Sequence, residues 1–327
     1  MCEYKPLVSV IIPAYNHERF IEKAIRSIWG QTYSRLEIIV VNDGSTDGTG
    51  KVIRRLVPES PCELKFVDKK NQGVSATLNH GITLAEGEFV SFLASDDYYD
   101  RRYIEEFVET ARKRPDCDVF HCDAYEVDED GVVGSRISDI GSVAPAHGKC
   151  FFKILEGRER VIPSTLMVRY SLFDRVGLFD ETLVQEDLDF HLRAAKETSF
   201  CYIDKALFFS RKVMGSLGRN PRKWIGDGEL AINKHRDYIG DRYVEIMNSK
   251  FKRNVMICLS GSDYNGAFVY FKKAFFSCRS SNDRAIFLFH FSKSFSYFYI
   301  RNCIFKLTPP QSRLSNYLRG FIRKMRK

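Results

Sequence analysis

Short apolar runs and helix-like segments alternate four times within about the first hundred residues of this 327-residue chain. The runs are rich in β-branched side chains, and they cover residues 8–12, 36–41, 64–67 and 89–93. After the first run, apolar residues recur with the spacing of one helical face, at Ile21, Ala24, Ile25 and Ile28. This alternation predicts an α/β fold, in which a Rossmann-like, mostly parallel sheet is flanked by helices.

Polar segments follow the predicted strands, at residues 13–16, 42–47, 71–75 and 95–97. Ligands bind outside the carboxyl ends of strands in such sheets, so we expect the four segments to gather at one edge. Asp96 and Asp97 must emerge where their strand ends, because burying unpaired carboxylates is costly. Their hard oxygen ligands suit a divalent cation that grips phosphates. Taken alone, the pair also fits a helix N-cap and a solvated acid in a turn.

Two of these segments suit a nucleotide. Asp43 can accept hydrogen bonds from a base N–H or a ribose hydroxyl, and the helix start at residues 71–76 can offer backbone N–H groups to phosphate oxygens. Each segment alone equally fits an Asx-turn or ordinary helix capping. The chain has neither a GxxxxGK nor a GxGxxG motif, so the marks of P-loop and nicotinamide chemistry are missing.

A more variable pattern follows residue 100. We expect a helix over residues 100–114, a hairpin of strands 119–127 and 132–137, a strand over 163–168, and a short helix over 171–176. A further helix, over residues 186–196, opens with Glu186 and Asp187. A carboxylate beside an acceptor hydroxyl can act as a general base. The alternative is that these acids only favour the positive end of the helix.

The second half of the chain is increasingly basic. The net charge is +8, and no Asp or Glu appears after Asp283. Apolar residues near the end fall on one helical face ringed by Arg and Lys, at Leu314, Tyr317, Leu318, Phe321, Ile322 and Met325. We expect residues 311–327 to lie on an anionic membrane surface, with a helix packed on the catalytic domain as the alternative.

Length and composition predict two units. No apolar signal segment and no apolar run of about 18 residues is present, so we expect no transmembrane helix. The nine cysteines form no CxxC pair, which favours reduced thiols in a cytoplasm. We expect the protein to be cytoplasmic. The basic tail also suggests a peripheral position on the inner face of the cell membrane.

The order of motifs resembles glycosyltransferase family 2, the inverting enzymes of the GT-A type, from about Val8 to Ser216. Five motifs at family-like spacing carry the resemblance: Val8–Asn16, Val41–Asp47, Asn71-x-Gly73 with Asn79-x-Gly81, Gly87-Glu88-Phe89 leading to Asp96-Asp97, and Val176–Asp180 leading to Glu186-Asp187. It implies a GT-A domain over residues 1–218, with a nucleotide-binding half to about 100 and an acceptor half after it. Residues 219–327 would form a helical, basic, aromatic-rich extension.

The resemblance also implies roles for individual residues. Asp187 would deprotonate the acceptor hydroxyl, with Glu186 in support, and Asp96 and Asp97 would hold Mn²⁺ or Mg²⁺ on the diphosphate. The nucleotide-sugar pocket would include Pro13, Tyr15, Asn16, Asp43, Asn71, Gly73, Ser75, Ser95, Asp96 and Arg211. The expected donor is a nucleotide sugar of the UDP or dTDP type, and the expected acceptor is a glycan or lipid-linked glycan in bacterial surface-polysaccharide synthesis.

Two positions depart from the family pattern. Ala94 stands where the family often has Asp, and Val213 stands where it often has a His that contacts metal or phosphate. Arg211 and Lys212 could neutralise diphosphate charge instead. The Gln-x-x-Arg-Trp signature of processive synthases is missing, which favours a single sugar addition.

Two other functions remain open at this point. A nucleotidyltransferase would share an α/β nucleotide pocket, but Glu186-Asp187 and the lack of a Gly-rich basic phosphate loop argue against it. A non-catalytic membrane- or nucleic-acid-binding protein would fit the basic tail, but the set of Asp43, Asp96 and Asp187 argues against it. We therefore expect an enzyme and no nucleic-acid partner.

Overall fold

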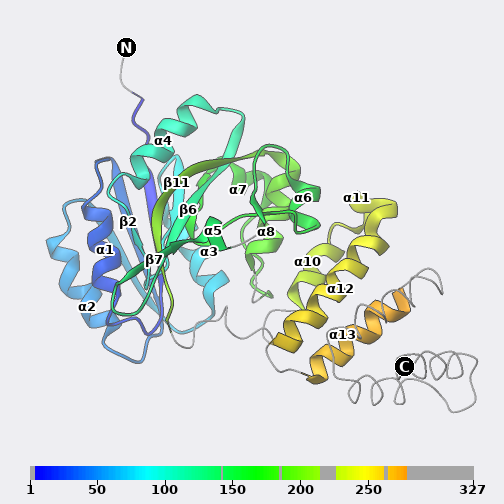
Figure 1. Cartoon of the computed structure of the whole chain (residues 1–327). Helices are drawn as coiled ribbons and strands as arrows, with labels where there is room; N and C mark the ends of the chain where they lie inside the picture. Colours follow the sequence, from blue (N-terminus) through cyan, green and yellow to red (C-terminus); the bar gives the residue numbers. More distant parts are fainter. Residues whose placement is uncertain (1–3, 141–142, 184–185, 214–225, 261–263, 278–327) are drawn as a thin grey trace, which may run out of the picture. The chain divides into compact units, whose positions relative to one another are not determined.

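Figure 1 shows the computed structural model, which describes residues 4–140, 143–183, 186–213, 226–260 and 264–277. The chain divides into two compact units, Met1–Tyr238 and Ile239–Lys327. The first unit thus extends beyond residue 218, where the sequence predicts the catalytic domain to end; that boundary stays a prediction. The tail segment 311–327 lies outside the described residues.

The first unit is built on a mixed sheet of nine described strands, with neighbours in the order β3-β2-β1-β4-β10-β6-β11-β5 and with β7 beside β6. The strands are β1 (Val8–Ala14), β2 (Leu36–Asp43), β3 (Glu63–Lys69), β4 (Phe89–Phe92), β5 (Tyr98–Tyr99), β6 (Cys117–Val127), β7 (Val133–Arg136), β10 (Met167–Arg169) and β11 (Ser199–Arg211). A separate parallel pair joins β8 (Ala144–Pro145) and β9 (Glu159–Arg160). The predicted α/β fold with a mostly parallel sheet is confirmed.

The first four strands of the chain that enter this sheet are parallel. β1 pairs with β2 on one side and β4 on the other, and β2 pairs with β3. Every residue of β2 and β4 is buried, as expected for strands covered on both faces. Their carboxyl ends therefore meet at one edge. Beyond β4 the sheet becomes mixed, because β10 runs antiparallel to β4 and to β6.

Helices cover the sheet (Figure 1). Those of the first unit are α1 (Ile21–Trp29), α2 (Thr49–Leu56), α3 (Val74–Leu84), α4 (Tyr103–Lys113), α5 (Ile137–Ile140), α6 (Phe151–Leu155), α7 (Ser171–Val176), α8 (Glu186–Glu197) and α10 (Asp227–Asn233), with 3₁₀ turns at Val57–Glu59 and Pro163–Thr165. The apolar face predicted for α1 is buried. Helix α3 lies directly on β1, since a Cβ on Gly81 would come within 2.4 Å of Ile11 Cγ2.

Strands β10 and β11 differ from the sequence-based expectation. Residues 163–168 form a 3₁₀ turn followed by the short β10, because Pro163 cannot donate to a sheet. The long strand β11 was not predicted. Its alternation is interrupted where the pairing with β6 shifts register between Ile203 and Phe208, and exposed Asp204 and Lys205 lie in that interruption.

The second unit is helical in its described part. Helix α11 (Arg236–Ile239) spans the boundary between the units. After it, a 3₁₀ turn at Gly240–Arg242 leads to α12 (Tyr243–Ser260), which packs against α13 (Tyr264–Ser277). In the part of the chain that the structure describes, no helix combines the length and the apolar character needed to cross a bilayer.

Candidate active site

The ends of β1 and β2 are joined by side chains that the sequence predicted to lie together. The backbone N–H of Asn16 donates to Ser45 Oγ at 2.9 Å, and the N–H of Thr46 donates to Asn16 Oδ1 at 2.8 Å. Asn16 has a left-handed φ of 54°, a conformation that Asn tolerates better than most residues. Pro13 is half-buried and Tyr15 is 46% exposed at the same edge. The two loops therefore form one hydrogen-bonded surface.

Asp43, at the end of β2, is bound by three donors. Its carboxylate pairs with Lys69 and accepts the backbone N–H groups of Gln72 and Gly73, both at 2.9 Å. The turn after it needs glycine, because Gly44 has φ +70° and an added Cβ would lie 2.7 Å from the backbone nitrogen of Asn71. Two amides that were expected to face phosphate at the start of α3 thus bind Asp43 instead.

Helix α3 ties this edge to the segment that precedes α8. Ser75 Oγ donates to the carbonyl of Leu183 at 3.2 Å. The Asn79 amide donates to the carbonyl of Phe179 and accepts the N–H of Phe179, both at 2.9 Å. Asn71 and Gly73, also predicted for the donor pocket, are exposed. The sheet edge that carries Asp43 and the chain leading to Glu186 are therefore directly connected.

The segment after β4 carries Ser95, Asp96 and Asp97 in three different environments. Ser95 is buried and forms a hydrogen bond with His17 Nδ1 at 2.7 Å. The Asp96 side chain is 14% exposed and its Oδ1 lies 3.8 Å from the same nitrogen. Asp97 is buried, and its Oδ1 accepts the N–H of Arg211 at 2.6 Å. Burial, aided by the neighbouring Asp96 charge, raises the pKa of Asp97 well above its ordinary value.

Arg211 ends β11 and is largely buried beside this segment. Its Nε donates to the backbone carbonyl of Asp96 at 3.0 Å, and its Nη1 donates to the carbonyls of Asp128 at 2.7 Å and Glu129 at 3.0 Å. The guanidinium also lies 4.9 Å from the Phe20 ring centroid. Arg211 therefore joins the Asp96 segment to the hairpin turn between β6 and β7.

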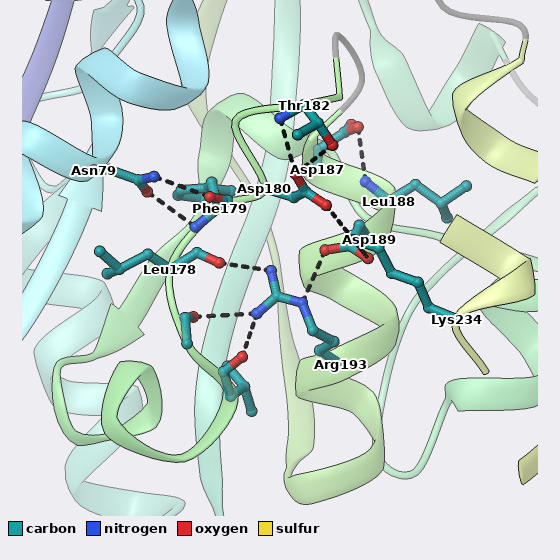
Figure 2. A network of polar contacts seen from close by, with 12 residues as sticks. Asn79, Leu178, Phe179, Asp180, Thr182, Asp187, Leu188, Asp189, Arg193 and Lys234 are labelled. Carbon is teal, nitrogen blue, oxygen red and sulfur yellow. Dashed lines mark hydrogen bonds and ion pairs between the residues drawn. The ribbon is translucent and has the colours of Figure 1, made fainter. Parts of the chain in front are cut away.

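Glu186 and Asp187 open α8, and both are partly buried. Asp187 Oδ1 accepts the N–H of Leu188 at 2.8 Å (Figure 2). Burial raises the pKa of Glu186 to about 7, with smaller contributions from the charges of Asp187 and Asp227. Near pH 7, Glu186 is therefore present in both its protonated and its charged form.

The contacts reveal residues that the sequence analysis missed. His17 contacts both Ser95 and Asp96, and Lys69 neutralises Asp43. His17 could have been found as the polar residue following Asn16 at a strand end. Lys69 lies at the end of β3, directly opposite Asp43 in the strand pairing, and that pairing is the signal that would have identified it.

The residues present fit a divalent cation held jointly with a ligand. Among the described residues, no three His, Cys, Asp or Glu side chains form a complete metal cluster. Asp96 and Asp97 nevertheless carry hard oxygen atoms at the same edge of the sheet. Mg²⁺ in phosphate-transferring sites is typically bound by one or two carboxylates, with substrate phosphates and water completing its shell. The partly exposed Asp96 carboxylate, with buried Asp97 beside it, fits that arrangement.

Comparison with known proteins gives concordant findings. A family model described as glycosyl transferase family 2 matches residues 9–177. An uncharacterised glycosyltransferase of Rickettsia typhi is 30% identical over 279 residues, which cover 83% of this chain and 81% of the relative.

Solved structures share the fold. The crystal structure of Staphylococcus aureus TarS 1–349 in complex with UDP-GlcNAc matches with a TM-score of 0.64 at 21% identity, covering 96% of this chain and 92% of that one. The mannosyltransferase PcManGT of Pyrobaculum calidifontis, in complex with GDP-Man and Mn²⁺, matches with a TM-score of 0.50 at 16% identity, covering 98% of this chain and 85% of that one.

Proposed function

The chain belongs to glycosyltransferase family 2, and on that premise we propose that it transfers a sugar, with inversion, from a nucleoside diphosphate to an acceptor hydroxyl. One observation carries the proposal. The strand-end segments bearing Asp43 and Asp96 form a hydrogen-bonded edge, and Ser75 and Asn79 tie that edge to the segment leading to Asp187. An acid for the nucleoside, an acid for a cation and an acid for the acceptor are the minimum set for this reaction.

We assign donor binding to the sheet edge formed by the segments that follow β1, β2 and β4 (residues 15–18, 44–48 and 93–97), which we call the donor edge. A carboxylate has about four acceptor sites, so Asp43 can still accept a base N–H beside the three donors it already binds. Pro13, Tyr15 and Asn16 would surround the nucleoside, and the exposed ring of Tyr15 offers it an apolar face. Asn71, Gly73, Ser75 and Ser95 would line the remaining pocket. The nucleotide sugars in the two structural neighbours support this class of donor.

Asp96, with Asp97 behind it, is the proposed holder of Mn²⁺ or Mg²⁺. Such a cation, when bound, stabilises the negative charge that develops on the leaving diphosphate. Asp96 is partly exposed, so its carboxylate can contact the cation directly. Asp97 is buried and bound by the Arg211 N–H, so we assign it a role in supporting Asp96. The three backbone carbonyls around Arg211 favour a role in positioning this segment over direct contact with diphosphate.

Asp187 is the proposed general base. One carboxylate on the face opposite the leaving group gives in-line attack and inversion at the anomeric carbon, by the logic that inverting hydrolases also use. Glu186 stands beside Asp187 with its pKa raised to about 7, and we assign it a supporting role to Asp187. Nucleotidyl transfer would have no need of a base at this position.

The acceptor is proposed by its chemistry alone, as a glycan or lipid-linked glycan of a cell-surface polysaccharide reached at the inner face of the membrane. The sequence suggests the basic tail at residues 311–327 as the element that reaches the membrane. The basic tail lies outside the described residues, so the membrane role stays a proposal.

The donor assignment is tested by thermal shift with UDP-, dTDP- and GDP-linked sugars, with and without Mn²⁺. A bound donor raises the melting temperature of the native state. We expect a UDP or dTDP sugar to do so in a Mn²⁺-dependent way and to release nucleoside diphosphate on incubation. Asp96→Asn should lose the Mn²⁺-dependent increment, whereas Asp174→Asn, at an exposed position on α7, should retain it. If no nucleotide sugar stabilises the protein or is consumed, the proposal fails.

A further inference from the structure

A cluster of charged side chains holds the segment that precedes the candidate base (Figure 2). Asp189 lies in the first turn of α8 and is fully buried. Its Oδ2 accepts Arg193 Nε at 2.8 Å, and its Oδ1 lies 2.8 Å from Lys234 Nζ. A buried carboxylate of this kind requires partners, because desolvating an unpaired charge is costly.

Arg193 connects Asp189 to the backbone of residues 176–178. Its Nη2 donates to the carbonyl of Leu178 at 2.8 Å, and its Nη1 donates to the carbonyls of Val176 and Gly177. Gly177 has φ +76°, so the chain turns sharply at the carbonyls that the Arg193 guanidinium binds. Three consecutive carbonyls are thus fixed against one face of α8.

The gripped segment also contacts the donor edge. The Phe179 ring lies 5.7 Å from that of Phe92 at the end of β4, and 4.8 Å from that of Phe190 on α8. Its backbone is bound on both sides by Asn79 of α3. Residues 176–183 therefore contact both the strand that leads to Asp96 and the helix that begins at Glu186.

Lys234 also binds this segment. It lies outside the part of the chain that the family model matches, which ends at residue 177. It follows α10, a helix that packs on α8 within the first unit. Its ammonium group contacts Asp180 as well as Asp189. Asp180 in turn accepts the N–H of Thr182 at 2.8 Å, which closes the turn that leads toward Glu186.

We propose that Lys234 is a positioning residue for the base: by bridging Asp180 and Asp189, it fixes residues 176–183 on α8 and thereby holds the Asp187 carboxylate at the acceptor hydroxyl. This inference rests on the proposed function of Asp187. Burial lowers the pKa of Lys234, but the two carboxylates outweigh that effect and raise it overall, so the ammonium stays charged. Displacing a catalytic group by about 1 Å can reduce a rate by about 100-fold, so a modest loosening has a measurable effect.

The test compares Lys234→Met with Lys234→Arg and with Lys196→Met. Lys196 is exposed near the other end of α8, where its ammonium lies over the Tyr238 ring and contacts no residue of the 176–183 segment in any described interaction. We expect Lys234→Met to lower kcat about tenfold with the Kd for the nucleotide sugar within about twofold. Lys234→Arg should recover most of the rate, and Lys196→Met should match the unaltered protein. Equal losses in kcat and donor affinity, or no loss at all, would overturn the proposal.

Amide hydrogen exchange without any substrate separates this inference from the proposed function. Lys234→Met should speed exchange at residues 176–183, and Lys196→Met should not. If the unaltered protein transfers no sugar but the exchange result appears, the function is wrong and the restraint by Lys234 stands as structure only. Unchanged exchange in an active enzyme would exclude the positioning role.

Discussion

At the proposed donor edge, Asp43 and Asn16 are held mainly by backbone amides and hydroxyls, with Lys69 also pairing with Asp43. The segment before Asp187 is held mainly by the charges of Asp189, Arg193 and Lys234. The donor edge is continuous with the parallel strands, so the backbone of the sheet already determines its shape. The segment before Asp187, residues 176–183, belongs to no strand and depends on side chains of α3 and α8 and on Lys234, which follows α10. Substitutions in the two halves of the proposed site should therefore have different effects.

The largest expected effect is on the base itself. Asp187→Asn keeps the shape of the side chain but cannot accept the proton of the acceptor, so kcat should fall by about 10²–10⁴-fold. The Kd for the nucleotide sugar should remain within about twofold, because the donor edge does not contain this residue. Steady-state transfer assays and calorimetric binding measure the two quantities. Asp174→Asn serves as the control, and a variant with a normal rate would remove Asp187 from the base role.

Gly44→Ala should disturb the donor edge, because Gly44 lies in the turn that follows β2. The added Cβ meets the backbone of Asn71 in a left-handed turn, and we expect a loss of about 2–5 kcal/mol from the free energy of unfolding. Donor affinity should fall more than kcat at saturating donor, the reverse of the pattern for Asp187→Asn. Urea unfolding and donor titration test this.

The control for that experiment is Gly30→Ala. The nearest atom to a Cβ on Gly30 lies 3.5 Å away, and its φ of −81° suits alanine. If Gly30→Ala and Gly44→Ala destabilise the protein equally, the turn after β2 has no special role.

A smaller effect on stability is expected from the titration of Glu186 at the start of α8. The folded state raises the pKa of Glu186 from about 4.5 to about 7, so it binds an extra proton between these values. The free energy of unfolding should therefore fall as pH rises from about 4.5 to 7, by at most about 3 kcal/mol from this group. Glu186→Gln should remove that decline, whereas Glu197→Gln, exposed at the other end of α8, should keep it. Parallel curves for Glu186→Gln and the unaltered protein would contradict the assignment.

The smallest effect should come from an exposed ion pair of the donor half. Arg55 on α2 pairs with Glu22 on α1 at the surface. Exposed pairs contribute about 0–1 kcal/mol, so Arg55→Met should barely change the midpoint of urea unfolding. A larger loss would mean that charge pairs stabilise both halves alike, and the contrast between them would disappear.

The donor half could be largely predicted from the sequence because its strands are apolar runs ending in polar residues. The order of Asn16, Asp43 and Asp96 along the chain, with the rule for parallel strands, was enough to bring their segments together. The start of α8 at Glu186 was also predicted, since its acids open a helical pattern. What the sequence could not show was the use of backbone amides at Gln72 and Gly73 by Asp43, which depends on the exact path of the turn.

The rest of the site depends on contacts between distant segments. The pairing of Lys234 with Asp189, and of Asn79 with Phe179, has no local periodicity to reveal it. Strand β11 was missed because its register shifts break the two-residue repeat by which strands are recognised. The position of Arg211 beside Asp97 follows from that strand and could not be predicted without it.

The irregular pairing of β11 also constrains how the length of this chain can evolve. Between Ile203 and Phe208, five steps along β11 correspond to two along β6. Side chains alternate between the faces of a strand, so deleting one residue here would turn all later ones over and bring Lys212 to the place of Arg211. Lys has no planar fork with which to bind several carbonyls at once. Related chains should therefore accept substitutions at the exposed residues 204 and 205 far more readily than insertions or deletions between them.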